Sequence, residues 1–244
     1  MKKILIILLL PLFSISQSNF NLQLLGTYQW SFSEGSDIWG WVDSNGNEFA
    51  LVGLNDGFSV VDVTNPMNLN EMFYIPDLNS TWRDIKTWGN YAYVTTEADA
   101  GLLIVDLSDM SGNTYWHKTN FTNPNGQSTE FTAAHNIYID ENGIAYIFGA
   151  SSNSGSNPSN GAIFLDVAAD PINPHYLGEW DQNYIHDGMV RGDTMYAGCI
   201  YAGELFIVDV SNKSNPQTLG SKSTPSNFTH NAWVSDDGEY VFTT

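Results

Sequence analysis

"GLLIVDLSDM" occupies residues 101–110, and its pattern recurs three more times in the chain. The other copies are "GFSVVDVTNP" (57–66), "GAIFLDVAADP" (161–171) and "GELFIVDVSNKSNP" (203–216). Each copy begins with glycine, continues as an apolar run and ends at an aspartate followed by turn-forming residues. The four aspartates, Asp62, Asp106, Asp166 and Asp209, lie 44, 60 and 43 residues apart. The longest interval holds a polar insertion at 150–161, which we expect to be a loop.

Each repeat has room for four short strands. In the second repeat the strand candidates are 83–89, 90–97, 101–110 and 113–121, and we find no convincing helix in the body of the chain. Fourth-strand candidates of the other repeats are 71–77, 175–181 and 217–223. Four strands at a period of roughly 40–45 residues are typical of a propeller blade. The sequence therefore predicts an all-β fold, a β-propeller of four-stranded antiparallel blades.

The repeats do not add up to a whole number of blades. Residues 22–30 resemble a fourth strand without a blade of its own, and the sequence stops inside the second strand of a fifth repeat. We therefore expect about four and a half blades, an incomplete ring and an N-terminal fragment of a longer protein. The alternative is a short protein that closes its exposed edges by forming an oligomer.

The segments "GLLIVDLSD" and "GELFIVDVSN" resemble the LVIVD repeat. Together with histidines at the heads of strands, they make the chain similar to the choice-of-anchor B family of exported bacterial β-propellers. The resemblance implies a fold and a location, the cell surface or the extracellular space, and it implies no particular reaction. Members differ in how the C-terminus is anchored, so any anchor is expected in a missing C-terminal part.

The first residues predict export. Two lysines precede an apolar run at 4–13, and small and polar residues follow, which is the pattern of a signal peptide. We assign 1–16 to the signal peptide and 17–244 to the propeller, and we expect no transmembrane segment once the signal is removed. A lone cysteine, Cys199, excludes an internal disulfide, and its apolar surroundings predict a buried thiol.

Charge excludes one class of partner. The chain has 8 lysines and arginines against 27 aspartates and glutamates, a formal charge of -19. Nucleic acid binding needs clustered cations, so we expect no nucleic acid partner. A protein, peptide or glycan at the cell surface is the partner that remains.

Aligning the repeats by their first strands produces a column of paired polar residues. In a propeller these strands line the central channel, so the column predicts a ring around one end of it. The residues expected to bind a ligand there are Asp37, Arg83, Asp84, His135, Asn136, His186, Asp187, His230 and Asn231.

Three interpretations of this ring stay open. His135, His186 and His230 could hold a divalent metal such as zinc, iron, nickel or copper, because imidazole suits these ions. Arg83 speaks against a pure metal ring and favours a bound anion or small ligand. Alternatively, each polar residue bonds the neighbouring blade and fixes where its strand begins.

No stronger catalytic motif is present, so we expect a protein that binds or scaffolds and does not catalyse. Trp82 lies beside Arg83 and could stack on a sugar or a peptide. The rival hypothesis is a propeller hydrolase with a metal on the channel axis.

Overall fold

The computed structural model describes residues 22–152 and 160–244, so the predicted signal peptide at 1–16 lies outside the described residues. Within these ranges the chain is almost entirely β-structure, with a single short 3-10 turn at Pro225–Asn227 and no α-helix. The predicted all-β propeller is confirmed. Within the same ranges no helix is long and apolar enough to cross a membrane.

Four sheets have four antiparallel strands each, and every sheet follows chain order. Blade 1 comprises β1 (Gly35–Val42), β2 (Glu48–Leu54), β3 (Gly57–Asp62) and β4 (Asn70–Pro76). Blade 2 comprises β5 (Arg83–Trp88), β6 (Tyr91–Thr96), β7 (Leu102–Asp106) and β8 (Tyr115–Lys118). Blade 3 comprises β11 (Asn136–Ile139), β12 (Ile144–Phe148), β13 (Ala162–Asp166) and β14 (His175–Trp180). Blade 4 comprises β15 (Asp187–Arg191), β16 (Thr194–Cys199), β17 (Glu204–Asp209) and β18 (Gln217–Ser223).

Two hairpins complete the strands. β9 (Asn120–Thr122) pairs with β10 (Ser128–Glu130), and β19 (Ala232–Val234) pairs with β20 (Val241–Thr243) at the start of the fifth repeat. The fourth strand expected at 22–30 is wrong, because these residues form no strand. They pass beside blade 1, where the Trp30 indole donates a hydrogen bond of 2.7 Å to Glu71 on β4.

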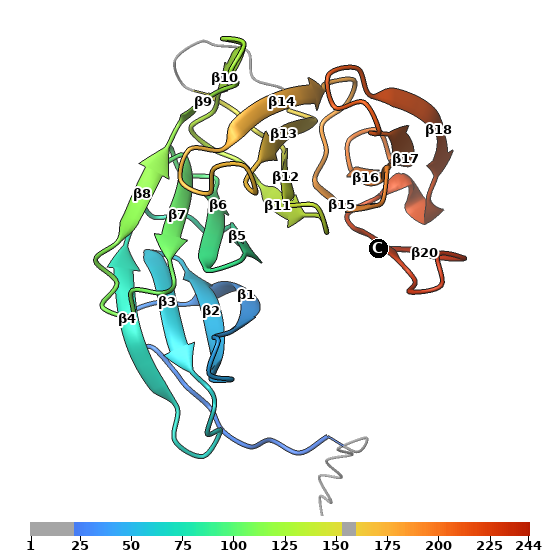
Figure 1. Cartoon of the computed structure of the whole chain (residues 1–244). Coiled ribbons are helices and arrows are strands. Elements are labelled where there is room, and N and C mark those ends of the chain that lie inside the picture. The colour runs from blue at the N-terminus through green and yellow to red at the C-terminus, as the bar shows by residue number, and fades with distance from the viewer. Residues whose placement is uncertain (1–21, 153–159) are drawn as a thin grey trace, which may run out of the picture.

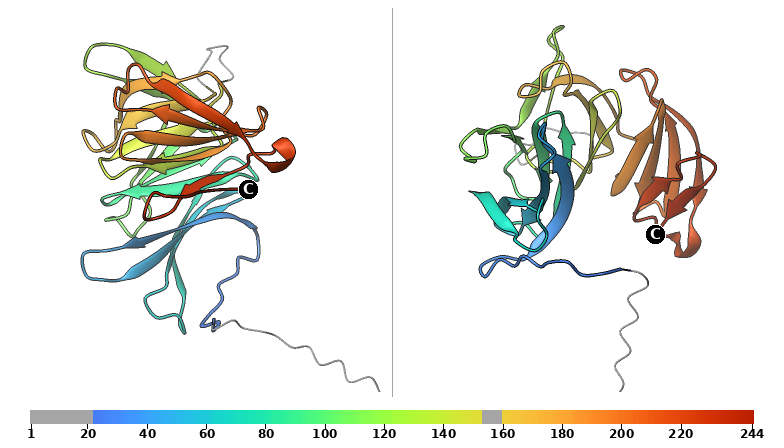
Figure 2. Two further views of the ribbon diagram at one scale, coloured as in Figure 1. Left: turned by 90° about the vertical axis from the view of Figure 1, so that its right-hand side faces the viewer. Right: turned by 60° about the horizontal axis from the view of Figure 1, so that its bottom comes forward.

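The blades follow one another along an arc that does not close into a ring (Figure 1). First strands β1, β5, β11, β15 and β19 contact one another in succession along the inner side of the arc. Fourth strands β4, β8, β14 and β18 lie on its outer side (Figure 1). Figure 2 shows the same stack of sheets from two further directions, with β19–β20 next to blade 4. Residues at the head of each first strand are thereby brought to one region.

The apolar core is divided into layers between neighbouring blades. One cluster packs Leu51 and Phe58 of blade 1 against Ile85 and Leu103 of blade 2. Equivalent clusters join blades 2 and 3 and blades 3 and 4. Cys199 belongs to the last cluster and is buried as predicted, and burial raises the pKa of its thiol to about 12. Each blade is therefore stabilised mainly by its neighbours, as expected for radial repeats.

The repeat motif has a structural explanation at both ends. A Cβ added at Gly57 would lie 2.3 Å from the Ile75 carbonyl oxygen on β4, and one at Gly101 would lie 2.4 Å from the Lys118 carbonyl oxygen on β8. At the other end, Asp62 accepts a 2.9 Å hydrogen bond from the Thr64 amide. Asp106 and Asp209 accept the same bond from the amide two residues on, and Asp166 accepts from the amide three residues on. The glycine permits close approach of the fourth strand, and the aspartate stabilises the turn leading to it.

Candidate functional site

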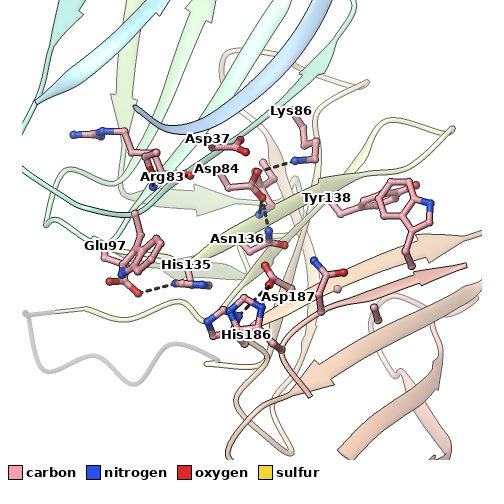
Figure 3. Close-up of a pocket in the computed structure, with 18 of the residues that line it drawn as sticks. Asp37, Arg83, Asp84, Lys86, Glu97, His135, Asn136, Tyr138, His186 and Asp187 are labelled. Atoms are coloured by element: carbon pink, nitrogen blue, oxygen red, sulfur yellow. Dashed lines mark hydrogen bonds and ion pairs between the residues drawn. The ribbon is translucent and has the colours of Figure 1, made fainter. Parts of the chain in front are cut away.

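A cavity of about 540 Å³ opens where the first strands begin, and we call it the channel-mouth cavity. All nine residues singled out from the polar column line it, although they come from five different repeats. Figure 3 shows how the side chains of blades 2, 3 and 4 approach one another there. The column alignment therefore identified a real spatial cluster.

Three imidazoles lie at the centre of the cluster. The ring centroids of His135 and His186 are 3.9 Å apart, and those of His186 and His230 are 4.1 Å apart. His135 and His186 are mostly buried, whereas the side chain of His230 is 45% exposed. Burial, followed by the neighbouring His186 ring, lowers the pKa of His230. The neutral form of His230, which carries a free lone pair, is favoured.

Two carboxylates orient these rings. Glu97 Oε1 lies 2.7 Å from Nδ1 of His135, and Asp187 Oδ2 lies 3.0 Å from Nδ1 of His186 (Figure 3). Asp187 Oδ2 also lies 3.6 Å from Nδ1 of His230. In His135 and His186 the Nδ1 atom is engaged, so the Nε2 atom is the one left for a ligand.

A second acidic pair lies one blade away. Asp84 accepts hydrogen bonds at both oxygens, from Lys86 Nζ at 2.7 Å, from the Asn136 amide group and from the Ile137 backbone amide at 2.9 Å (Figure 3). Burial, followed by the charge of Asp84 and a hydrogen bond with it, raises the pKa of Asp37 to about 7. The Asp37 carboxyl therefore keeps its proton to higher pH than an ordinary aspartate.

Some residues of the polar column have a structural role, because they form hydrogen bonds with the next blade. Asp37 Oδ2 accepts a 2.9 Å bond from the Ile85 amide of the next blade, just as Asp84 accepts from Ile137. The Ser36 hydroxyl accepts a 2.8 Å bond from the Arg83 amide. These bonds fix the junctions of blades 1 with 2 and 2 with 3. The histidines and Asp187, in contrast, face the cavity.

The expectation for Arg83 needs correction. Its guanidinium is fully buried, forms a 2.7 Å ion pair with Asp77 and donates to the carbonyl oxygens of Leu54 and Leu78. Figure 3 shows the side chain turned away from the histidines. Only the backbone end of Arg83 faces the cavity, because the N–H donors of its guanidinium group are bonded to Asp77, Leu54 and Leu78. Arg83 therefore does not supply the positive charge that an anionic ligand would need.

The two asparagines differ. Asn136 donates to Asp84, and its Oδ1 atom is buried without a hydrogen-bond partner in the described parts of the chain. Asn231 is exposed at the rim.

Several lining residues were not expected from the column. They are Trp39, Lys86, Glu97, Tyr138, Tyr184, Tyr201 and Trp233. Glu97 directly follows β6 and Tyr201 follows β16 by two residues. Since second strands run antiparallel to first strands, their ends reach the level where first strands begin. The two positions after each second strand were a signal that could have found both Glu97 and Tyr201.

Comparison with known proteins supports the repeat and the fold. The LVIVD repeat matches residues 45–76, 81–114 and 190–224. These segments overlap blades 1, 2 and 4, and blade 3 has the same four-strand order without a match. None of the curated proteins matches the chain.

Solved β-propeller structures resemble the chain at low sequence identity. PorZ, described as a bacterial surface component of the type-IX secretion system of Porphyromonas gingivalis, has a TM-score of 0.60 at 16% identity, over 86% of this chain and 30% of that one. The β-propeller domain of Swd1 from Myceliophteria thermophila has a TM-score of 0.53 at 11% identity, over 87% and 64%. A periplasmic gluconolactonase from Pseudomonas aeruginosa has a TM-score of 0.55 at 10% identity, over 79% and 55%. The chain spans less than two thirds of each, and such identities show the fold alone.

Proposed function

We propose that this chain is an exported bacterial propeller of the cell surface, of the choice-of-anchor B type, that binds a protein or peptide presenting lysine or arginine side chains. The ligand occupies the channel-mouth cavity. LVIVD repeats, the leader-like N-terminus and the fold shared with a bacterial surface component support the location.

The observation that carries the proposal is the charge and aromatic content of the cavity. Arg83 is paired with Asp77, and Lys86 is paired with Asp84 at 2.7 Å. Among the described residues, Glu97 and Asp187 form no ion pair with a lysine or arginine, and their partners are His135 and His186. An acidic cavity attracts cations and repels anions.

Aromatic side chains complete the rim. Trp82 is 54% exposed, and Trp233 and Tyr201 are exposed as well. Exposed aromatic faces beside carboxylates bind ammonium and guanidinium groups by cation–π attraction together with ion pairing. Lys86, held 4.5 Å from the Trp39 ring, is an internal example of this contact. The volume suits one or two long basic side chains, since ligand cavities are about 300–1,000 Å³.

The test is a calorimetric titration of the full chain with a synthetic decapeptide rich in lysine and arginine. We expect saturable binding that weakens at least tenfold in Trp82→Ala and in Glu97→Gln. Glu239→Gln removes an exposed charge that does not line the cavity, and it controls for attraction to the overall negative charge. Tyr115→Ala does the same for an exposed aromatic on the outer strand β8.

Equal weakening in Glu97→Gln and Glu239→Gln would overturn the proposal, because it would show attraction to overall charge. Binding of neutral oligosaccharides in place of the peptide would assign the cavity to a glycan instead.

A hydrolase with a metal on the channel axis is the second candidate, and the three adjacent imidazoles favour it. It predicts turnover of a lactone or phosphoester substrate that stops when a chelator removes the metal.

A further inference from the structure

The histidine cluster has chemistry that a basic ligand does not explain. His135, His186 and Asp187 each offer one ligand atom, and these atoms all lie within 4.8 Å of one another. Two ligand atoms of one tetrahedral zinc ion, each about 2.0–2.2 Å from it, are about 3.3–3.6 Å apart. Side-chain rotations that move each ligand atom by less than about 1 Å would therefore bring the three atoms around one ion.

The His135 imidazole is already held in the orientation that metal binding requires. Histidine ligands commonly donate their second ring N–H to a carboxylate, which fixes the tautomer and raises basicity at the metal. Glu97 provides such a carboxylate for His135, 2.7 Å from Nδ1. The Nε2 atom of that ring is thereby left as the metal ligand.

A fourth ligand is within reach. His230 begins the fifth repeat, its ring centroid lies 4.1 Å from that of His186, and its Nδ1 lies 3.6 Å from Asp187 Oδ2. Its partial exposure leaves it free to move toward an ion or to leave the fourth position to water. Three protein ligands with one open position are typical of zinc sites at which a ligand or substrate binds.

The ligand types select among metals. Calcium and magnesium prefer sites made of oxygen atoms alone, whereas imidazoles with one carboxylate suit zinc, iron, nickel and copper. The neighbouring cations do not oppose a metal, because Arg83 is turned away and Lys86 is held by Asp84.

We propose that His135, His186 and Asp187 bind one divalent transition-metal ion at the channel mouth, with His230 as the fourth ligand and Glu97 positioning His135. The site shares a cavity with the proposed peptide ligand but stands on its own geometry, so either proposal can fail alone.

The test uses the full chain without a polyhistidine tag, freed of metal by a chelator and dialysed. Titration with Zn²⁺ in a calorimeter, and with Co²⁺ followed by its visible absorption, should give one equivalent and the spectrum of a four-coordinate nitrogen–oxygen site. We expect His186→Ala to weaken Zn²⁺ binding at least 100-fold. Glu97→Gln should still bind one equivalent of Zn²⁺, with an affinity about 10–100-fold lower, as expected on loss of an outer-shell partner.

His117→Ala is the matched control, because His117 lies on the outer strand β8 and its ring contacts the Ala100 carbonyl. This variant should bind Zn²⁺ as the unchanged chain does. If His186→Ala does not fold, Asp187→Asn takes its place. Less than half an equivalent of Zn²⁺ in the unchanged chain, or equal affinity in His186→Ala and His117→Ala, would overturn the metal site. Peptide titration of the chelator-treated chain tests the peptide proposal separately.

Discussion

Asp37 shows how one side chain can have a structural bond and an unusual charge state together. It accepts the Ile85 amide across a blade junction, yet burial and Asp84 raise its pKa to about 7. An unfolded aspartate titrates near about 3.9. Between these two pH values the unfolded chain loses a proton that the folded chain keeps, so stability falls as pH rises from about 4 to about 7 and does not fall further.

Asp37→Asn should therefore stabilise the protein at pH 8. Asparagine carries no charge, can still accept from Ile85 and can donate to Asp84. We expect the Tm at pH 8 to rise by about 2–4 °C, which corresponds to a gain of about 1 kcal/mol in the free energy of unfolding for a chain of this size. This value allows for the partial exposure of Asp37 to solvent. At pH 4 the variant and the unchanged chain should unfold together. Thermal unfolding at both pH values is the measurement, with Asp236→Asn in an exposed turn as the control. A gain that is larger at pH 4 contradicts the raised pKa of Asp37.

Arg83 is the opposite case, a charge that the polar column placed in the site and the fold uses elsewhere. Its side chain is fully buried with Asp77 and two carbonyl oxygens. Removing one member of a buried ion pair leaves the other charge uncompensated.

Arg83→Met should lower the free energy of unfolding by about 3–5 kcal/mol. Urea-induced unfolding followed by tryptophan fluorescence measures it, and Lys222→Met, at an exposed position of β18, should change it by less than about 0.5 kcal/mol. A loss below about 1 kcal/mol in Arg83→Met would show that the pair contributes little.

At this scale the sequence predicted which residues meet but not what each one does. Column position fixes the height of a side chain in the channel, which is why all nine line one cavity. It does not fix the rotamer. Arg83 is long enough to reach Asp77 and Leu78 beyond the blade junction, whereas the shorter histidines stay in the cavity.

At the scale of the element, glycine and aspartate of the repeat motif have separate tasks. Glycine at the start of β3 lies against the carbonyl group at the end of β4, and aspartate at the end of β3 holds the turn that leads to β4. The strands themselves were predictable from the repeat, and the fourth strand at 217–223 was located with its correct bounds. Residues 22–30 were not, because their apolar pattern resembles a strand while packing beside blade 1 replaces strand pairing.

Gly57→Ala should destabilise the protein because its Cβ would lie 2.3 Å from the Ile75 oxygen and 2.7 Å from the Tyr74 ring. Overpacking of this kind lowers the free energy of unfolding by about 1–3 kcal/mol. We expect a loss near the upper end of this range, because the obstructing atom belongs to the backbone and cannot rotate away. Gly220→Ala is the control, since nothing lies within 4 Å of its Cβ position and its φ is not left-handed. It should be neutral or slightly stabilising. Equal unfolding midpoints in urea for the two variants would contradict the proposed role of the motif.

At the scale of the molecule, the open arc has two terminal faces that no other described residue covers with a sheet. Ile38 and Val42 are exposed on β1, and Trp233 and Phe242 are exposed on the β19–β20 hairpin. Exposed apolar residues next to unpaired strand edges favour association. We expect residues 17–244, expressed alone, to form oligomers at micromolar concentration in size-exclusion chromatography with light scattering. A monomer with a sharp, reversible unfolding transition would contradict this expectation.

We propose that the basic ligand binds in the channel-mouth cavity, which is assembled from the heads of separate blades. NMR of the tryptophan indole N–H groups can locate the ligand, because the eight tryptophans are distributed from residue 30 to residue 233. During titration with the basic decapeptide, we expect the resonances of Trp39, Trp82 and Trp233, which line the cavity, to shift, while those of the outer-strand residues Trp116 and Trp180 stay unchanged. A shift at Trp30, which lines a separate cavity, with no change at Trp39, Trp82 and Trp233 would show that the ligand binds elsewhere.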